Sequence, residues 1–312
     1  MEHIQIKGLN KPVSKLIMGS DFFNLSNGPA VSEILGHYLA IGGNCIDSAH
    51  NYCGGESEQA IGRWLDETGK RESMVLFTKG AHPKGDGPRV NSEAIRSDLF
   101  TSLERMRTDY IDLYGLHRDD PNVPVGHILE ALNEHVEAGR IRAFGGSNWT
   151  HERLQEAADY AAKHGLIGFS FSSPNLSLAK PNEPFWAGCV SVDSEALRWY
   201  EANQFPLLSW SSQARGFFTG KFSPDVRDNA DMVRVFYNDE NWLRLERAKQ
   251  LAAEKGVSMI QIALAYVISQ PLPACALIGP RSEAEMISCR DGAQIKLTRE
   301  ELAWLDLTGT AV

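Results

Sequence analysis

The chain has 312 residues, 43% of them hydrophobic, and a formal net charge of −9. This length and apolar content are sufficient for a large buried core, and a single barrel of alternating strands and helices reaches this size. The acidic balance and the lack of any run of Lys or Arg disfavour nucleic acid and anionic membranes as partners.

The N-terminus and the cysteines indicate the compartment. The first ten residues, MEHIQIKGLN, lack the charged-then-apolar pattern of a signal peptide, and no apolar run is long enough to span a bilayer. The five cysteines are widely spaced and include no CxxC pair, which argues against a disulfide framework and against structural zinc. We therefore expect a soluble, cytoplasmic protein with reduced thiols.

The first half of the chain is predicted to form a hairpin, over residues 1–15, and then alternating strands and helices. Apolar residues at helical spacing, such as Ile34, Leu35 and Tyr38, indicate helices, whereas short apolar runs indicate strands. The expected strands are 16–19, 44–47, 74–78, 111–116 and 141–145. The expected helices are 31–41, 56–67, 92–105, 125–138 and 150–163.

The second half continues the alternation, with two longer loops. Ser258 with Gln261 and Thr298 with Glu301 have the spacing of capping boxes at helix starts. The expected strands are 167–171, 206–210 and 274–278. The expected helices are 193–203, 241–255, 258–269, 282–290 and 298–307.

Eight core strands, each followed by a helix, favour a (β/α)8 TIM barrel. Short strands that are apolar throughout are typical of parallel strands covered on both sides. No linker-like stretch marks a second domain, so we predict one domain over 1–312: a hairpin (1–15) at the bottom, a barrel (16–291), and a C-terminal helix and tail (292–312). A doubly wound sheet is the alternative, although no GxGxxG follows a predicted strand.

Polar residues stand where several of these strands end. In a barrel, the C-terminal ends of the strands all open on one face, where active sites lie. Tyr52 is on the loop just beyond the second of these strands, before the turn at Gly54 and Gly55. The polar residues at the strand ends are Asp47, Lys79, His117, Ser147, Asn148 and Ser211.

These residue types favour proton donation to a carbonyl. A nearby ammonium favours the phenolate, so Lys79 is expected to lower the pKa of Tyr52. Asp47 is expected to hold Lys79 charged, and His117 to hydrogen-bond the substrate oxygen. The chain has no GxSxG and no Cys beside a His at a strand end. Proton donation coupled to hydride transfer therefore fits better than acyl transfer.

Six stretches along the chain resemble, in order, the motifs of the aldo-keto reductase superfamily. They are DSAHNYCGGESEQAIG, VLFTKG, IDLYGLH, AFGGSN, SWSSQARGFFTGKF and ALIGPRS, and they extend over essentially the whole chain. The resemblance implies a (β/α)8 barrel that reduces aldehydes or ketones with NAD(P)H and uses no metal. It makes Tyr52 the general acid and Asp47, Lys79 and His117 the other members of a catalytic tetrad.

The resemblance also implies a cofactor site that favours NADPH, with NADH possible. Ser147 and Asn148 are expected to hold the nicotinamide carboxamide, and Arg281 and Ser282 to meet the 2′-phosphate of the adenosine, where a guanidinium suits a phosphate. Residues expected along the pyrophosphate are Ser211, Ser212, Gln213, Arg215, Gly216 and Lys221. Further cofactor contacts are expected at Gly19, Ile278 and Gly279.

The chain departs from the family pattern at three places. The glutamine usual on the sixth strand is absent from GFSFSSPNLSL, so Ser172 or Asn175 is expected to replace it. Trp210 is the candidate for the aromatic stacked on the nicotinamide. Glu285 and Cys289 stand where a Gln and an Asn usually hold the adenosine, and a Glu there would repel a phosphate unless it faced the ribose hydroxyls.

The sequence indicates the substrate and the partners less specifically than the catalytic residues. Phe22, His82, Arg118 and Trp149 are candidate substrate contacts, and the alternative for each is a polar or packed loop residue. The polar residues of the loops hint at a sugar-derived carbonyl. A non-catalytic NADP(H)-binding redox sensor or regulatory subunit on the same barrel is the alternative function, and a metal-dependent isomerase or hydrolase is disfavoured because few metal ligands stand at strand ends. Both a monomer and a homo-oligomer remain open.

Overall fold

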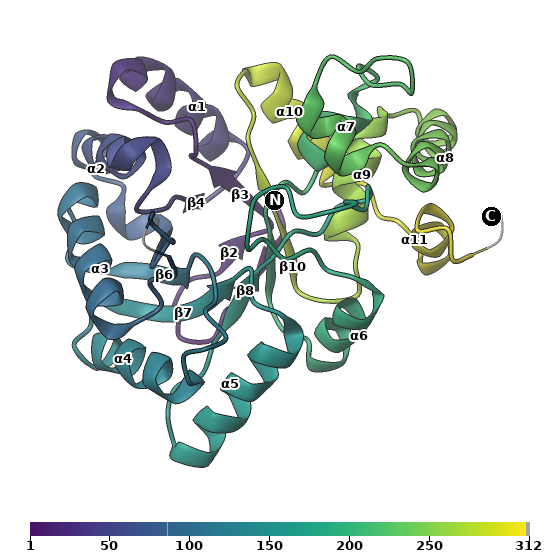
Figure 1. The fold of residues 1–312 in the computed structure, drawn as a ribbon. Helices are drawn as coiled ribbons and strands as arrows, with labels where there is room; N and C mark the ends of the chain where they lie inside the picture. Colours follow the sequence, from purple (N-terminus) through teal and green to yellow (C-terminus); the bar gives the residue numbers. More distant parts are fainter. Residues whose placement is uncertain (86, 310–312) are drawn as a thin grey trace.

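The computed structural model describes residues 1–85 and 87–309. Within these residues, eight parallel strands close into a barrel in the order β10-β3-β4-β5-β6-β7-β8-β9 (Figure 1). The predicted (β/α)8 barrel is confirmed, and the doubly wound alternative is wrong because the first and last strands pair. The strands are β3 (Leu16–Gly19), β4 (Cys45–Asp47), β5 (Val75–Gly80), β6 (Ile111–Leu116), β7 (Ile141–Ser147), β8 (Phe171–Ser173), β9 (Leu207–Ser209) and β10 (Ala274–Ile278).

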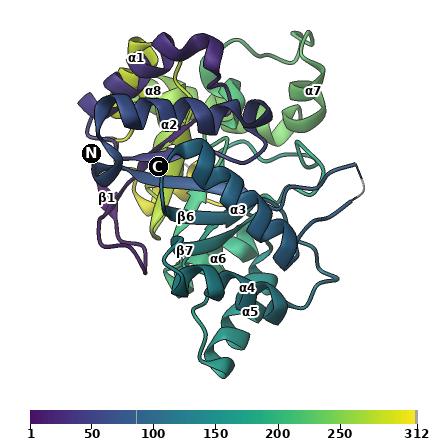
Figure 2. The ribbon, with the colours of Figure 1, turned by 90° about the vertical axis from the view of Figure 1, so that its left-hand side faces the viewer.

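Helices surround the barrel on the outside (Figures 1 and 2). The helices that follow the strands are α1 (Gly28–Ala40), α2 (Glu56–Thr68), α3 (Ser92–Met106), α4 (Val125–Glu137), α5 (His151–His164), α6 (Ser194–Asn203), α9 (Met259–Ile268) and α10 (Glu283–Gly292). The additional helices are α7 (Ala230–Phe236), α8 (Asp239–Lys255) and α11 (Arg299–Leu305). Helix α7 was not among the sequence predictions.

The N-terminal hairpin closes the bottom of the barrel. Its strands β1 (His3–Ile4) and β2 (Val13–Ser14) pair antiparallel. Ile4, Ile6 and Val13 join one buried cluster with the inward residues of the barrel strands, such as Phe77 and Phe171. In Figure 2 the hairpin and α7 lie at opposite ends of the barrel. The C-terminal ends of the strands therefore form a separate open face, called the mouth below.

One predicted strand is displaced along the chain. Residues 167–171 were expected to pair, but β8 begins only at Phe171, and Ile167 is exposed. The side-chain amide of Asn133 in α4 donates to the carbonyl of Ile167 at 2.9 Å and accepts from its N–H at 2.9 Å. This tertiary contact satisfies the backbone groups that a ladder would otherwise use, so the segment crosses from helix to barrel as a loop.

Two helices together have the composition of a membrane span. Within residues 1–85 and 87–309 no single helix is long and apolar enough to cross a membrane. Helices α8 and α9 pass that test only as a pair, and they meet at a 98° bend. Helix α9 is almost entirely buried against the barrel, as expected of a core helix.

Candidate active site

The two-residue period of the strands decides which side chains enter the mouth. In β5, Val75 and Phe77 belong to the cluster inside the barrel, so Lys79 continues the inward face at the top of the strand. In β4, Cys45 is inward and Asp47 follows it by two residues. His117 follows the inward residue Leu113 by four residues, with Gly115 between them, so it also continues an inward face. The three charged or titratable groups therefore converge at the mouth.

Lys79 and Asp47 form a buried ion pair. Both side chains are only 2% exposed, and the Lys79 ammonium contacts Asp47 Oδ1. Lys79 Nζ also donates to the carbonyl of Ser48 at 2.8 Å and lies 3.5 Å from the hydroxyl of Tyr52. The ammonium is thus held by two oxygens of the β4 end and faces the phenol with its remaining hydrogen.

A tight turn after β4 aims the phenol. Tyr52 N donates to the carbonyl of Ala49 at 3.0 Å, and Cys53, Gly54 and Gly55 all have left-handed φ angles of 47°, 64° and 99°. At Gly55 a Cβ would come within 2.4 Å of the guanidinium carbon of Arg105. Gly55 is therefore required both by its φ angle and by the close approach of Arg105.

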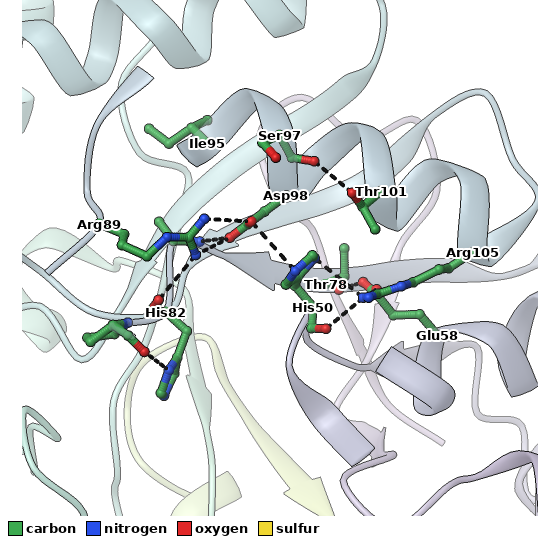
Figure 3. A network of polar contacts seen from close by, with 12 residues as sticks. His50, Glu58, Thr78, His82, Arg89, Ile95, Ser97, Asp98, Thr101 and Arg105 are labelled. Atoms are coloured by element: carbon green, nitrogen blue, oxygen red, sulfur yellow. Dashed lines mark hydrogen bonds and ion pairs between the residues drawn. The ribbon is translucent and has the colours of Figure 1, made fainter. Parts of the chain in front are cut away.

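Arg105 of α3 ties this turn to the helices outside the barrel (Figure 3). Its Nη1 donates to the His50 carbonyl at 2.7 Å and to Glu58 of α2 at 3.1 Å. Glu58 is fully buried and also accepts from the Thr78 hydroxyl of β5 at 2.7 Å. Sequence patterns did not predict this network because its members come from four separate elements.

The proton affinities follow from burial. Burial raises the pKa of Asp47 to about 6, although the Lys79 charge opposes it. Burial lowers the pKa of Lys79, and Asp47 opposes that shift. Burial also raises the pKa of Tyr52 well above its usual value. The expected lowering of the Tyr52 pKa by Lys79 is not seen in the protein without ligands, because burial of the phenolate and the charges of Asp47 and Asp21 raise that pKa.

His117 is a neutral imidazole beside the phenol. Burial, and then the Lys79 charge, lower the pKa of His117 well below its usual value. The His117 and Tyr52 rings meet edge to face with centroids 5.7 Å apart. His117 Nδ1 is buried and has no hydrogen-bond partner among the described residues. A neutral imidazole and a protonated phenol are the states that can hydrogen-bond one carbonyl oxygen.

Asn148 is fully engaged within the protein. Its amide nitrogen donates to the His117 carbonyl and to the Ser147 hydroxyl, both at 3.2 Å. Its amide oxygen accepts from Val190 N and from the Trp210 indole N–H, both at 3.1 Å. With four bonds the amide has no spare donor. Asn148 thus joins the His117 strand end to Trp210, and a carboxamide contact would require one of these bonds to exchange.

The residues expected to replace the sixth-strand glutamine lie differently from one another. Ser172 is fully buried, and its hydroxyl bonds the Gly146 carbonyl and the Tyr200 hydroxyl, on the side of β8 that faces α6. The period of β8 explains this, because Phe171 is inward and Ser172 outward. Asn175 instead binds the Trp210 carbonyl at 2.9 Å and lies beside the mouth. Of the two, the structure therefore places only Asn175 by the mouth.

The segment after β9 is a tight turn with four left-handed residues. Ser211, Ala214, Arg215 and Gly216 have left-handed φ angles of 47°, 48°, 52° and 85°. Two of its N–H groups donate within the turn, Ala214 N to the Ser211 carbonyl at 2.8 Å and Gly216 N to the Gln213 carbonyl at 3.1 Å. Ser212 donates to the carbonyl of Leu277 at 2.8 Å, which anchors the loop to β10.

The side chains of this loop make contacts of their own. Gln213 donates to the Ile260 carbonyl at 3.1 Å, and its Oε1 lies 3.9 Å from Cys289 Sγ. The guanidinium of Arg215 lies over the rings of Phe185 and Trp186, at 4.6 and 5.1 Å. Lys221 is exposed. The loop after β8 therefore reaches across to the loop after β9 through Arg215.

The first turn of α10 forms the other end of the expected cofactor site. Ser282 caps the helix by accepting from Glu285 N at 3.3 Å. Glu285 accepts from Arg281 N at 2.8 Å, so its carboxylate is already bound to the loop. The exposed guanidinium of Arg281 lies 4.3 Å from the ring centre of Phe22. Gly279 follows β10 at the mouth, whereas Ile278 belongs to the core cluster outside the strands, so its side chain points away.

The candidate substrate contacts divide into two groups. The His82 ring lies 4.8 Å from the His117 ring, and Arg118 follows His117 directly, so both are at the mouth. Trp149 is 1% exposed and packs edge to face on Phe169, so it is a core residue and the expected substrate contact is not supported. Phe22 instead pairs with Arg281, and a Cβ at Gly279 would lie 4.0 Å from its ring.

The described residues contain no group of three or more His, Cys, Asp or Glu side chains placed to hold a metal ion. Separately, Asp47, Lys79, Tyr52 and His117 form one cluster of titratable groups at the mouth. It can donate a proton to an oxygen placed between the phenol and the imidazole.

Comparison with known proteins shows the family to which the sequence is similar. The sequence model of the Aldo/keto reductase family matches residues 15–307. A probable voltage-gated potassium channel subunit beta of Oryza sativa is 28% identical, over 79% of this chain and 76% of its own. The NADP(+) aldo-keto reductase yakc of Schizosaccharomyces pombe is 28% identical over 78% and 73%. The solved glycerol dehydrogenase of Gluconobacter oxydans has a TM-score of 0.78 and 25% identity, covering 98% of this chain and 94% of that one.

Proposed function

The chain belongs to the aldo/keto reductase family of NAD(P)H-dependent oxidoreductases, and from this we propose that it reduces an aldehyde or ketone to the alcohol with NADPH and Tyr52 as general acid. The observation that carries the proposal is the contact of the Tyr52 hydroxyl with the Lys79–Asp47 ion pair, 3.5 Å from Lys79 Nζ, beside the neutral His117.

The four residues divide the work of protonating a carbonyl oxygen. NADPH, when bound, supplies the hydride that the carbonyl carbon accepts. Tyr52 transfers its phenolic proton to the oxygen as the C–O double bond becomes single, and the alcohol and a phenolate result. Lys79 stabilises that phenolate by its charge, which offsets part of the cost of burying it. His117 donates a hydrogen bond that orients the carbonyl, and solvent returns the proton to Tyr52.

The residues at the mouth fit a dinucleotide. The tight turn between Ser211 and Gly216, which carries the guanidinium of Arg215, supports a pyrophosphate site there. Arg281 and the N-terminus of α10 present positive charge where a 2′-phosphate would lie. Only Arg281 and the N-terminus of α10 support NADPH over NADH, because both cofactors carry the pyrophosphate. Glu285 accepts a hydrogen bond from the backbone N–H of Arg281, which fixes its carboxylate in place but does not cancel its repulsion of a phosphate.

The experiment is NADPH consumption with a panel of aldehydes and ketones, among them sugar-derived carbonyls. We expect turnover that falls about 10²- to 10⁴-fold in Tyr52→Phe, with NADPH affinity retained. Tyr110→Phe is a matched control, since Tyr110 lies outside the mouth and contacts Glu72 at the surface. Equal loss in both variants, or none in Tyr52→Phe, would remove the phenol as the acid.

A redox-sensing or regulatory subunit is the second candidate, because one relative is named as a probable potassium channel subunit. This function requires NADPH binding but no proton transfer from Tyr52. Tight NADPH binding, no turnover of any carbonyl in the panel and a partner that co-purifies would favour this candidate. Turnover that depends on Tyr52 would favour the reductase.

A further inference from the structure

Arg118 is a buried arginine at the mouth without an acidic partner. Its side chain is 93% buried, since the residue is 7% exposed. The adjacent acid, Asp119, is bonded to Arg153 Nε at 3.1 Å instead. Among residues 1–85 and 87–309, no carboxylate forms an ion pair with Arg118. A buried charge usually has such a partner, because removal of a charge from water is costly.

Backbone carbonyls hold the guanidinium in place on two sides. Nη1 donates to the carbonyl of His117 at 2.8 Å, and Nε donates to the carbonyl of Ala187 at 3.1 Å. Gly188 has a φ of 71°, and a Cβ there would come within 3.2 Å of Arg118 Cδ. The loop after β8 therefore passes directly over the arginine stem, and a side chain at Gly188 would disturb it.

The other end of the guanidinium is free to bind a ligand. Nη2 makes no hydrogen bond to any described residue, and it is not among the atoms sealed from solvent. The Arg118 charge acts on two catalytic groups. Burial raises the pKa of Tyr52, and Arg118 opposes that rise. Burial, Lys79 and then Arg118 lower the pKa of His117. The Nη2 end of the Arg118 guanidinium is therefore close enough for its charge to act where the substrate carbonyl oxygen would lie, between Tyr52 and His117.

We propose that Arg118 binds an anionic group, a carboxylate or a phosphate, on the carbonyl substrate. This inference rests on the proposed reductase function and narrows its substrate class. The guanidinium is planar, permanently charged and already oriented by two carbonyls, so the anion gains a charge-assisted bond at little cost in side-chain entropy. Lys79 is paired with Asp47 and Asp119 with Arg153. Arg118 is therefore a positive charge at the mouth that has no ion-pair partner among the described residues, although the Asp21 carboxylate also acts on Tyr52.

The test compares anionic aldehydes with neutral partners of equal length. The carboxylate arm uses glyoxylate, 4-oxobutanoate and 5-oxopentanoate, each against its methyl ester. The phosphate arm uses glyceraldehyde 3-phosphate against glyceraldehyde. We expect kcat/KM to favour the anion by about 10- to 100-fold in at least one pair, and the arm that shows it identifies the anion. Ratios near one in every pair would overturn the proposal.

Variants separate binding of the anion from a structural role of Arg118. Arg118→Met should bring the ratio to about one while turnover of the neutral partner persists, and Arg118→Lys should retain part of the preference. Arg299→Gln removes a charge at an exposed ion pair with Glu201 and should leave the ratio unchanged. Equal losses on anionic and neutral substrates in Arg118→Met would contradict the proposal.

Binding provides a readout independent of turnover. Isothermal titration of the NADP+-mixed protein with 4-hydroxybutanoate and with its methyl ester should show tighter binding of the anion in the wild type but not in Arg118→Met. If no carbonyl is reduced and this difference is nevertheless seen, the reductase function fails while the anion site stands. If neutral aldehydes are reduced through Tyr52 and no difference appears, the anion site fails alone.

Discussion

The ammonium of Lys79 lies 3.5 Å from the hydroxyl oxygen of Tyr52 while it remains paired to Asp47. The ammonium therefore contacts three oxygens, those of Asp47, Ser48 and Tyr52. Tyr52 is partly exposed at the mouth, whereas the ion pair is buried below it. The arrangement keeps the phenol protonated before reaction and places the charge that a phenolate needs afterwards. This follows because burial opposes ionisation and the ammonium favours it.

Lys79→Met should lower carbonyl reduction by roughly 10²-fold, because the phenolate that forms loses its cation. It should also destabilise the fold by about 3 kcal/mol, because Asp47 is left buried without a partner. The measurements are kcat with a saturating carbonyl and urea unfolding. The double variant Asp47→Asn/Lys79→Met should recover most of the stability and none of the activity. Recovery of both would show that the ion pair acts only on folding.

Asp47 should make stability depend on pH in an unusual direction. Its pKa in the folded protein is about 6 against an ordinary 3.8, so the folded state binds the proton more tightly than the unfolded state. The resulting stabilisation is complete below about pH 4 and is lost as the pH rises through about 6. Relative to Asp47→Asn, the wild type should lose on the order of 3 kcal/mol across this range. The measurement is the free energy of unfolding in urea at several pH values. If it changed equally with pH in the two proteins, the raised pKa would be contradicted.

Gly55→Ala should impair both folding and catalysis. The new methyl group meets the Arg105 guanidinium at 2.4 Å, at a φ of 99°, so the turn that carries Tyr52 must shift. We expect a loss of about 1–3 kcal/mol in unfolding free energy and a lower kcat. Gly69→Ala is the control, because Gly69 also has a positive φ, 64°, but no atom lies within 4 Å. It should cost about 1 kcal/mol and leave kcat unchanged, so equal effects of the two variants on kcat would argue against the turn.

Arg281→Met should raise the KM for NADPH by about tenfold and leave the KM for NADH unchanged, because a guanidinium discriminates the 2′-phosphate. Steady-state kinetics with both cofactors provides the comparison. Arg290→Met is the control, since Arg290 lies in α10, which begins two residues after Arg281, and is exposed and paired with Asp291. A similar change for both cofactors in Arg281→Met would mean that Arg281 contacts a group that they share, or supports the loop through Phe22.

Local patterns in the sequence determined the barrel and most of the residues at its mouth. Apolar strands, helical spacing and strand-end positions are properties of neighbouring residues, so they indicated β4, β5 and β6 and the residues Asp47 and Lys79 that follow from them. Helix caps such as Thr298 with Glu301 are equally local, and the structure contains that capping box. The motif order identified the family for the same reason.

Only the tertiary structure decided how those groups are used. The start of β8 depends on the bonds that Asn133 makes to Ile167. The direction of the Tyr52 pKa shift depends on burial. The four bonds of Asn148 depend on two loops that meet over the mouth. The unpaired charge of Arg118 arises because its neighbour Asp119 turns to Arg153. Each outcome is set by contacts between residues far apart in the chain, and desolvation and pairing at such contacts exist only once the chain has folded.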